Sequence, residues 1–195
     1  SCLLYRVGAR QGDLSATNAN ELREWLARER GSMPGNADFA LHVAAPECYE
    51  AAALTSRPAG QVLPSEAPRL SYTRRVPVGV VGVISPFNAP LILSIRSVAP
   101  ALALGNAGVL KPDPRTAGCG GLALAAIFAE AGLPGGLFHV LPGGPDGGPG
   151  LVADPLVPGI SFTGSPPAGR AVGRRARGPR PRPPRGARAP RSGKA

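Results

Sequence analysis

The stretch Val78-Gly-Val-Val-Gly-Val-Ile-Ser-Pro-Phe-Asn-Ala-Pro90 decides the fold class of this chain. Its first half is a short run rich in Val and Ile, which is typical of a strand buried on both faces of a sheet. Its second half places Asn88 between Pro86 and Pro90, whose rings restrict the backbone directly after the strand. The helical stretch 91–104 follows, so the segment predicts one strand–loop–helix unit of a parallel sheet.

The same alternation of strand and helix continues downstream. Further strands are expected at 108–110, 137–141 and 159–163. A helix is expected over 116–131, opened by a capping Thr116 and closed by Gly132, and a shorter one around 151–153. Such repeats predict an α/β fold with a Rossmann-like parallel sheet and helices on both faces. Ligands of these sheets bind at the carboxyl ends of the strands.

Residues 18–76 are interpreted as N-terminal helices and a linker. The first helix carries side chains at the spacing i, i+3, i+4, i+7, namely Leu22, Trp25, Leu26 and Glu29. Gly31 and Pro34 should end it. A second helix is expected over 37–54, where Pro46 should kink or break it. Residues 57–76 form a Pro-rich, polar connection.

The two ends of the chain differ from the rest. Residues 1–17 show no sustained period and are set apart as an atypical N-terminal segment. Residues 174–195 consist almost entirely of Arg, Pro, Gly and Ala, so a disordered tail is expected there. That tail carries nine of the ten net positive charges, and the body of the chain is close to neutral. A frameshift in GC-rich coding DNA is one hypothesis for such a composition.

Cysteine and apolar content bear on the compartment. The three Cys residues are odd in number and have no metal-like spacing, which favours reduced thiols in the cytoplasm over a disulfide framework or a metal site. No apolar run reaches the roughly 20 residues that a membrane-spanning helix needs, so no membrane association is expected. Cys48 has no evident base beside it and packing is the expected role of Cys119, so neither is assigned as a nucleophile.

Two polar side chains stand out at the ends of predicted strands. The amide of Asn88 can donate a hydrogen bond to a developing oxyanion, although a lone Asn in a bend is more often a turn residue. Lys111 is the only Lys outside the tail and ends the strand 108–110. A compact ammonium suits ribose hydroxyls or a phosphate there, whereas a solvated surface Lys is the alternative.

Five ordered motifs resemble the aldehyde dehydrogenase superfamily. They are Val-Gly-Val-Ile-Ser-Pro-Phe-Asn-Ala-Pro90, Ala-Pro-Ala-Leu-Ala-Leu-Gly-Asn106, Leu-Lys-Pro112, Phe138-His-Val-Leu-Pro-Gly143 and Ile160-Ser-Phe-Thr-Gly-Ser165. The resemblance covers about residues 20–173. The sequences of residues 94–100 and 111–116 most resemble those of family members that act on benzaldehyde- and vanillin-type aldehydes. The resemblance makes 77–173 part of an NAD(P)-binding domain.

The resemblance assigns roles to matching positions. Asn88 would be the oxyanion-hole amide of the reaction. The residues implied to bind NAD or NADP are Ile84, Ser85, Pro86, Phe87, Lys111, Asp113, Gly143, Thr163, Gly164 and Ser165. Of these, Lys111 would hold the adenosine ribose. The residues 163–165 would meet the nicotinamide ribose and pyrophosphate at a helix N-terminus.

Departures from the family pattern limit these expectations. Many members carry an acidic residue three positions after the Lys, where this chain has Pro114, so NAD versus NADP stays open. Pro166 and Pro167 remove two N–H donors from the phosphate turn, which predicts weakened coenzyme binding. The catalytic Cys and Glu of the family come from later segments that this sequence does not contain. We therefore expect no aldehyde oxidation by this chain alone.

Partners follow from the same resemblance. Family members take an aldehyde substrate and form homo-oligomers, but the oligomer is not expected for this chain. The alternative interpretation is a non-catalytic nucleotide-binding module whose basic tail contacts nucleic acid through phosphates. The tail lacks the aromatic residues on which bases would stack, so nucleic acid is the less favoured partner.

Overall fold

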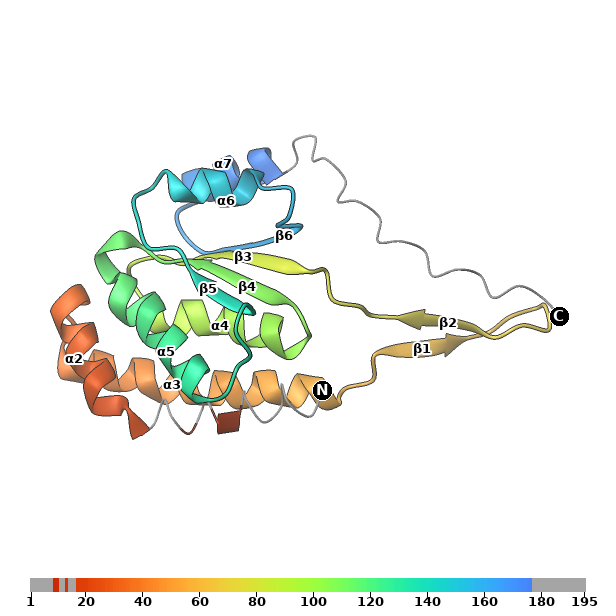
Figure 1. The fold of residues 1–195 in the computed structure, drawn as a ribbon, viewed down its shortest axis with the longest axis horizontal. Coiled ribbons are helices and arrows are strands. Elements are labelled where there is room, and N and C mark those ends of the chain that lie inside the picture. Colours follow the sequence, from red (N-terminus) through yellow and green to blue (C-terminus); the bar gives the residue numbers. More distant parts are fainter. Residues whose placement is uncertain (1–8, 11–12, 14–16, 177–195) are drawn as a thin grey trace.

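The computed structural model describes residues 9–10, 13 and 17–176, which form a sheet with helices on both sides and a projecting hairpin (Figure 1). The predictions for the remaining positions of 1–17 and for the tail from 177 onward lie outside the described residues. Ala9, Arg10, Asp13 and Thr17, the described positions in the N-terminal segment, are helical.

The sheet has four parallel strands in the order β5-β4-β3-β6. The strands are β3 (Val80–Ile84), β4 (Ala107–Lys111), β5 (Phe138–Val140) and β6 (Gly159–Phe162). All four were predicted, and the expected α/β class is confirmed. Ile84 pairs with Lys111 on one side and with Phe162 on the other, so the carboxyl ends of three strands meet at one edge.

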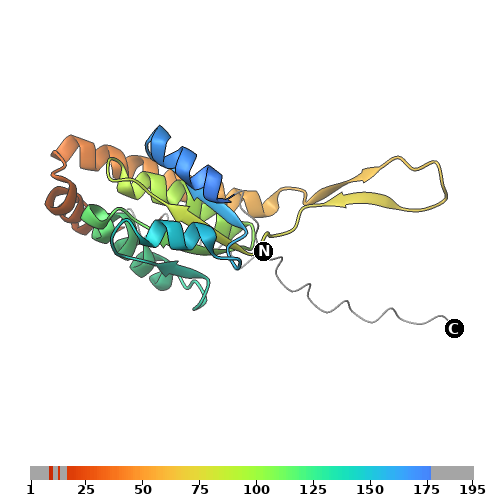
Figure 2. The same ribbon diagram turned by 90° about the horizontal axis from the view of Figure 1, so that it is seen from above.

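Helices cover both faces of this sheet (Figures 1 and 2). On one face lie α4 (Pro90–Ala103) and α5 (Ala123–Glu130), and on the other lie α6 (Gly147–Ala153) and α7 (Pro166–Ala176). Val83 of β3 and Leu110 of β4 are buried between these layers, which explains why these strands contain no alternating polar residues. The start of the predicted tail is corrected, because Arg174–Ala176 still belong to α7.

Two further helices pack beneath α4. The first, α2 (Ala19–Arg30), ends at Gly31 in the left-handed conformation, as predicted. The second, α3 (Pro34–Ala53), is continuous through Pro46, so the predicted break is wrong. Pro46 has no backbone N–H to donate to the carbonyl of His42, four residues earlier. Both residues are exposed, so water can donate to this carbonyl instead. The opposite side of α3 is buried against α4, and this packing holds the helix together. A short 3₁₀ turn, η1 (Leu54–Ser56), follows it.

The connection 57–76 contains a hairpin that was not predicted. β1 (Gly60–Leu63) pairs antiparallel with β2 (Ser71–Arg74) and projects from the body of the molecule (Figures 1 and 2). Its strands have only four residues and lack a buried face, so they carry no period-2 signal. Large hydrophobic side chains remain exposed along it, among them Val62, Leu70 and Tyr72.

The helical segment after β4 begins differently from the prediction. Asp113, not Thr116, caps it, because the Asp113 carboxylate accepts a hydrogen bond from the Arg115 backbone N–H. A 3₁₀ turn η2 (Pro114–Thr116) and a π-helical turn η3 (Gly118–Leu122) precede α5. The Thr116 hydroxyl is buried without a hydrogen-bond partner among the described residues. π-Turns are uncommon and often occur near functional sites.

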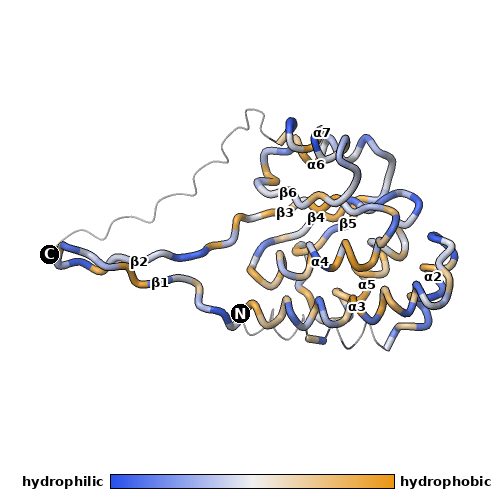
Figure 3. Tube along the Cα trace, turned by 180° about the vertical axis from the view of Figure 1, so that it is seen from behind, coloured by the Kyte–Doolittle hydropathy of each residue, from blue (hydrophilic) through white to orange (hydrophobic). Residues whose placement is uncertain are grey.

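Most of the helices and the central strands share one apolar core. It includes Leu22 and Leu26 of α2, as their spacing predicted, together with Ile95 of α4 and Leu124 of α5. Figure 3 shows the matching concentration of hydrophobic residues along α4 and the strands. Within the described part of the chain, no helix combines the length and apolar character needed to cross a membrane.

Candidate functional site

A groove of about 880 Å³ lies at the carboxyl edge of the sheet. Its walls come from the loops after β3, β4 and β6 and from the starts of α6 and α7. The lining residues are Ile84, Ser85, Pro86, Phe87, Asn88, Leu93, Lys111, Pro112, Asp113, Pro114, Arg115, Pro145, Gly148, Phe162, Thr163, Gly164, Ser165 and Ala168. This volume lies in the range of small-molecule and cofactor sites.

Ten of the eleven residues singled out from the sequence line this groove. They include Asn88 and Lys111, which come from different strand–helix units. The eleventh, Gly143, is joined to the groove because its carbonyl accepts a hydrogen bond from Lys111 Nζ. The structure therefore brings the predicted residues together, and their roles toward a ligand remain proposals.

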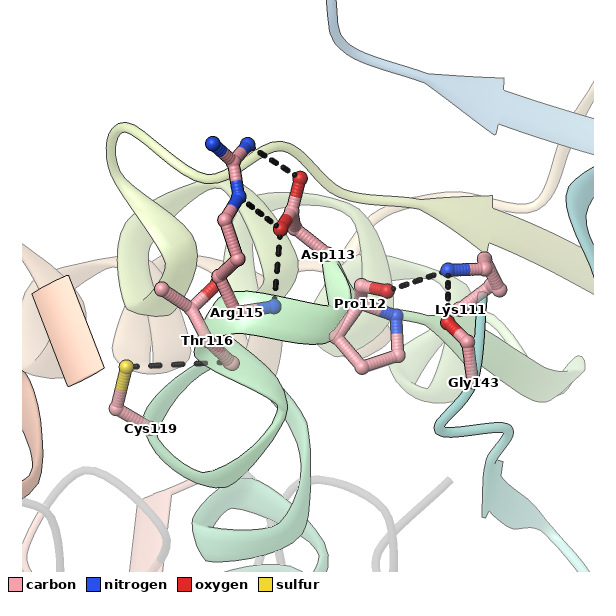
Figure 4. Close-up of polar contacts among 7 residues, drawn as sticks. All are labelled: Lys111, Pro112, Asp113, Arg115, Thr116, Cys119 and Gly143. Carbon is pink, nitrogen blue, oxygen red and sulfur yellow. Dashed lines mark hydrogen bonds and ion pairs between the residues drawn. The ribbon is translucent and has the colours of Figure 1, made fainter. Parts of the chain in front are cut away.

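Lys111 is held at the end of β4 by two backbone carbonyls (Figure 4). Nζ donates to the Pro112 oxygen at 2.8 Å and to the Gly143 oxygen at 2.9 Å. The residue is only 5% exposed, so it is not the solvated surface lysine of the alternative reading. Burial lowers the Lys111 pKa, and the nearby Asp113 carboxylate opposes that shift. An ammonium has three donors, and two are used within the described chain.

Asn88 lies in the bend between β3 and α4. Pro90 occupies the first turn of α4, where its missing N–H costs no helical hydrogen bond. The start of the bend is anchored because Ser85 N–H donates to the Lys111 carbonyl at 3.1 Å and Ser94 Oγ donates to Ser85 Oγ at 2.9 Å. Asn88 itself is exposed, and its amide has no hydrogen-bond partner in the described residues. Its donor is thus free for a ligand.

Arg115 is a groove residue that sequence reasoning missed. Its Nε and Nη2 donate to the two oxygens of Asp113 at 2.8 and 2.9 Å (Figure 4). Its guanidinium carbon lies 4.1 Å from the centre of the Phe87 ring, in a cation–π contact. The hydrogen bonds from Arg115 lower the Asp113 pKa. The Asp-x-Arg spacing could have suggested the ion pair, but no local pattern indicates the contact with Phe87.

The turn between β6 and α7 is poor in N–H donors. The first two residues of α7, Pro166 and Pro167, have no backbone N–H. The next N–H, of Ala168, is directed to Ser165 Oγ at 3.5 Å, and that of Gly169 bonds the Ser165 carbonyl at 2.9 Å. The helix start therefore offers an anion fewer donors than an ordinary N-terminus.

Neither thiol of the described residues lies in the groove. Cys48 in α3 and Cys119 in η3 are both fully buried and free of disulfides. Burial, reinforced by the Glu47 charge, raises the Cys48 pKa to about 12. Burial together with a hydrogen bond to Glu29 raises the Cys119 pKa even further. Both thiols are neutral at physiological pH and are poor nucleophiles.

A parallel sheet whose strand ends carry a buried Lys, an exposed Asn and a Gly-Ser turn is typical of α/β proteins that bind nucleotides. Residues 6–182 match the aldehyde dehydrogenase family. This chain belongs to that family. The match extends beyond the range 20–173 that the motifs alone delimited.

Individual relatives narrow the resemblance. The chain is 74% identical over 164 residues to a vanillin dehydrogenase of Amycolatopsis sp., a match covering 84% of this chain and 34% of that protein. A crystal structure of an NAD-dependent benzaldehyde dehydrogenase from Corynebacterium glutamicum superposes with a TM-score of 0.88 and 41% identity, over 92% of this chain and 39% of that one. The crystal structure of a glyceraldehyde-3-phosphate dehydrogenase from Methanocaldococcus jannaschii, complexed with NADP, superposes with a TM-score of 0.84 and 32% identity. That match covers 90% of this chain and 39% of the other.

The chain spans about a third of the length of the curated relatives it matches. Its homologues are NAD(P)-dependent aldehyde dehydrogenases, and the expectation of NAD or NADP as the family coenzyme is confirmed. The resemblance to vanillin- and benzaldehyde-type members is confirmed as well.

Proposed function

We propose that this chain is the coenzyme-binding part of an aldehyde dehydrogenase that oxidises an aromatic aldehyde to the carboxylic acid. The observation that supports this most directly is the shared groove of Asn88 and Lys111 at the carboxyl edge of the sheet. The similarity to proteins named vanillin and benzaldehyde dehydrogenases supports the aromatic substrate. Free, buried cysteines are consistent with a reducing compartment, which supports action in the cytoplasm.

The groove fits a dinucleotide at most of its positions. The buried Lys111 ammonium has a donor left for ribose hydroxyls, and the Gly143 carbonyl beside it fixes its direction. Glycines in the lining, Gly148 and Gly164, let a ligand approach the backbone closely. The Pro-rich start of α7 fits less well, because it lacks donors for the pyrophosphate. The predicted outcome is a bound coenzyme with reduced affinity.

Different residues of the groove would contact different parts of the coenzyme and the substrate. Lys111 and Asp113 would hold the adenosine end, and residues 163–165 would meet the nicotinamide ribose and pyrophosphate. Ile84 would exclude water beside the nicotinamide, which accepts a hydride when the coenzyme is bound. The free amide of Asn88 would donate to the substrate oxygen as negative charge develops on it.

We further propose that the chain alone does not turn over aldehyde. The reaction of this family needs a thiolate close to the coenzyme, and the thiols of Cys48 and Cys119 are buried, neutral and outside the groove. The other half of the proposal, coenzyme binding, is independent of this negative expectation and can be tested by itself.

Thermal denaturation of the chain with NAD and with NADP tests the binding. At ten times the dissociation constant, a ligand adds about 1.4 kcal/mol to the free energy of unfolding, which raises the Tm by about 3–6 °C. Lys111→Met removes the ammonium while keeping a side chain of similar length, and it should abolish the rise. No rise with either coenzyme up to millimolar concentrations would refute the proposal. Formation of reduced coenzyme with benzaldehyde should stay at background.

A further inference from the structure

The charges of the groove are unevenly distributed. Its lining contains two cationic side chains, Lys111 and Arg115, and one carboxylate, Asp113. A carboxylate in a dinucleotide groove ordinarily accepts hydrogen bonds from the ribose hydroxyls of NAD and repels the 2′-phosphate of NADP. Arg115 offsets the negative charge of Asp113 that would repel this phosphate, because it donates hydrogen bonds to both carboxylate oxygens.

Arg115 is held on two sides. The bidentate contact with Asp113 fixes the plane of the guanidinium, and the Phe87 ring covers one of its faces. The Asp113 carboxylate also caps η2 through the Arg115 backbone N–H at 3.0 Å. Nη1 is left without a hydrogen-bond partner within the described chain. A planar, always charged group with unused donors is well suited to a phosphate.

We propose that Arg115 sets the coenzyme preference of this groove by neutralising Asp113 and offering Nη1 to a 2′-phosphate, so that NADP is accepted alongside NAD. This inference rests on the proposed function, because it assigns a selectivity to the same coenzyme site. Pro114 between the two residues restricts the backbone, which keeps Asp113 and Arg115 in the paired arrangement.

Dissociation constants for NAD and NADP, measured by calorimetry on the full chain, test the role of Arg115. Arg115→Gln removes the positive charge and leaves Asp113 unneutralised. The ratio of the NADP to the NAD dissociation constant should rise about tenfold, the effect expected for one partly exposed charge-assisted hydrogen bond. Arg96→Gln is the matched control, because Arg96 also donates through Nε and Nη2 to one carboxylate, Glu47, and neither of these two residues lines the groove. Its ratio should equal that of the unmodified chain.

Asp113→Asn provides a test in the opposite direction. Asn can still accept the capping hydrogen bond from Arg115 N–H, but it frees the guanidinium from its counter-charge. The ratio of the NADP to the NAD dissociation constant should then fall. Ratios unchanged in both variants, with both coenzymes still bound, would overturn the role of Arg115 and leave the proposed function intact. Failure of the unmodified chain to bind either coenzyme would refute the proposed function, and the inference with it.

Discussion

Glu29 provides the sharpest test of how the N-terminal helices are attached to the sheet. Its carboxylate accepts hydrogen bonds from the backbone N–H groups of Gly118 at 2.9 Å and of Cys119 at 2.7 Å. These groups lie at the start of η3, where a helical segment has unpaired donors and favours negative charge. Glu29 in α2 thus caps a segment that follows it by about ninety residues.

Glu29→Ala would leave both donors without a partner in a largely buried position. A hydrogen bond to a charged group contributes about 1.5–3 kcal/mol, and loss of a helix cap costs about 0.5–2 kcal/mol. Because Glu29 is itself partly exposed, water relieves some of the loss. We expect the free energy of unfolding to fall by about 3 kcal/mol and the Tm by about 6–12 °C.

Urea and thermal denaturation, followed by circular dichroism, measure this effect. Trp25, the single Trp, reports on the same contact, since a Cβ placed at Gly118 would lie 3.0 Å from its ring. Glu24→Ala is the control, because Glu24 forms only an exposed i,i+4 pair with Arg28 and should cost less than about 0.5 kcal/mol. If Glu29→Ala were as stable as Glu24→Ala, the capping role would be wrong.

Three further predictions concern packing and the thiols. A Cβ at Gly120 would lie 2.7 Å from Pro90 Cβ, so Gly120→Ala should destabilise the chain by about 1–3 kcal/mol. Gly150 lies in helix α6, and a Cβ there would meet no atom within 4 Å, so Gly150→Ala should instead stabilise the chain by up to about 1 kcal/mol. Equal effects of the two substitutions in urea denaturation would contradict the close contact between Gly120 and Pro90. In a Cys2→Ser background, Cys48 and Cys119 should resist thiol reagents at pH 8 until the chain unfolds, and rapid native labelling would disprove their burial. The pKa of Cys48 is raised from 9.0 to about 12 in the folded chain, so the stability that this thiol contributes is complete below pH 9 and is lost as the pH rises toward 12. Cys48→Ala should therefore reduce the fall of the free energy of unfolding with pH between 9 and 12.

The groove was largely predictable because its residues sit directly after predicted strands. Parallel strands place their carboxyl ends at one edge, so Asn88 and Lys111 had to approach each other once the strand order brought β3 beside β4. The role of Arg115 in the groove was not predicted, because it depends on a contact with Phe87, which belongs to a different loop. A contact between loops leaves no periodic signal in either one.

Other features also depended on distant residues. Pro46 in a helix is locally unfavourable, yet packing against α4 keeps α3 continuous. Thr116 looked like a helix cap, whereas Asp113 and Glu29 supply the actual acceptors. The β1–β2 hairpin lacks a buried face and so lacks the alternation by which strands are recognised.

The sequence alone determined the order of the strand–helix units and the loops that carry polar residues, because buried strands need continuous apolar runs and their ends need turn residues. Tertiary structure alone decided which loops share the groove walls, how Arg115 is held between Asp113 and Phe87, and how Glu29 caps η3. Those contacts join residues far apart in the chain, and their energies arise only when the sheet has brought the elements together.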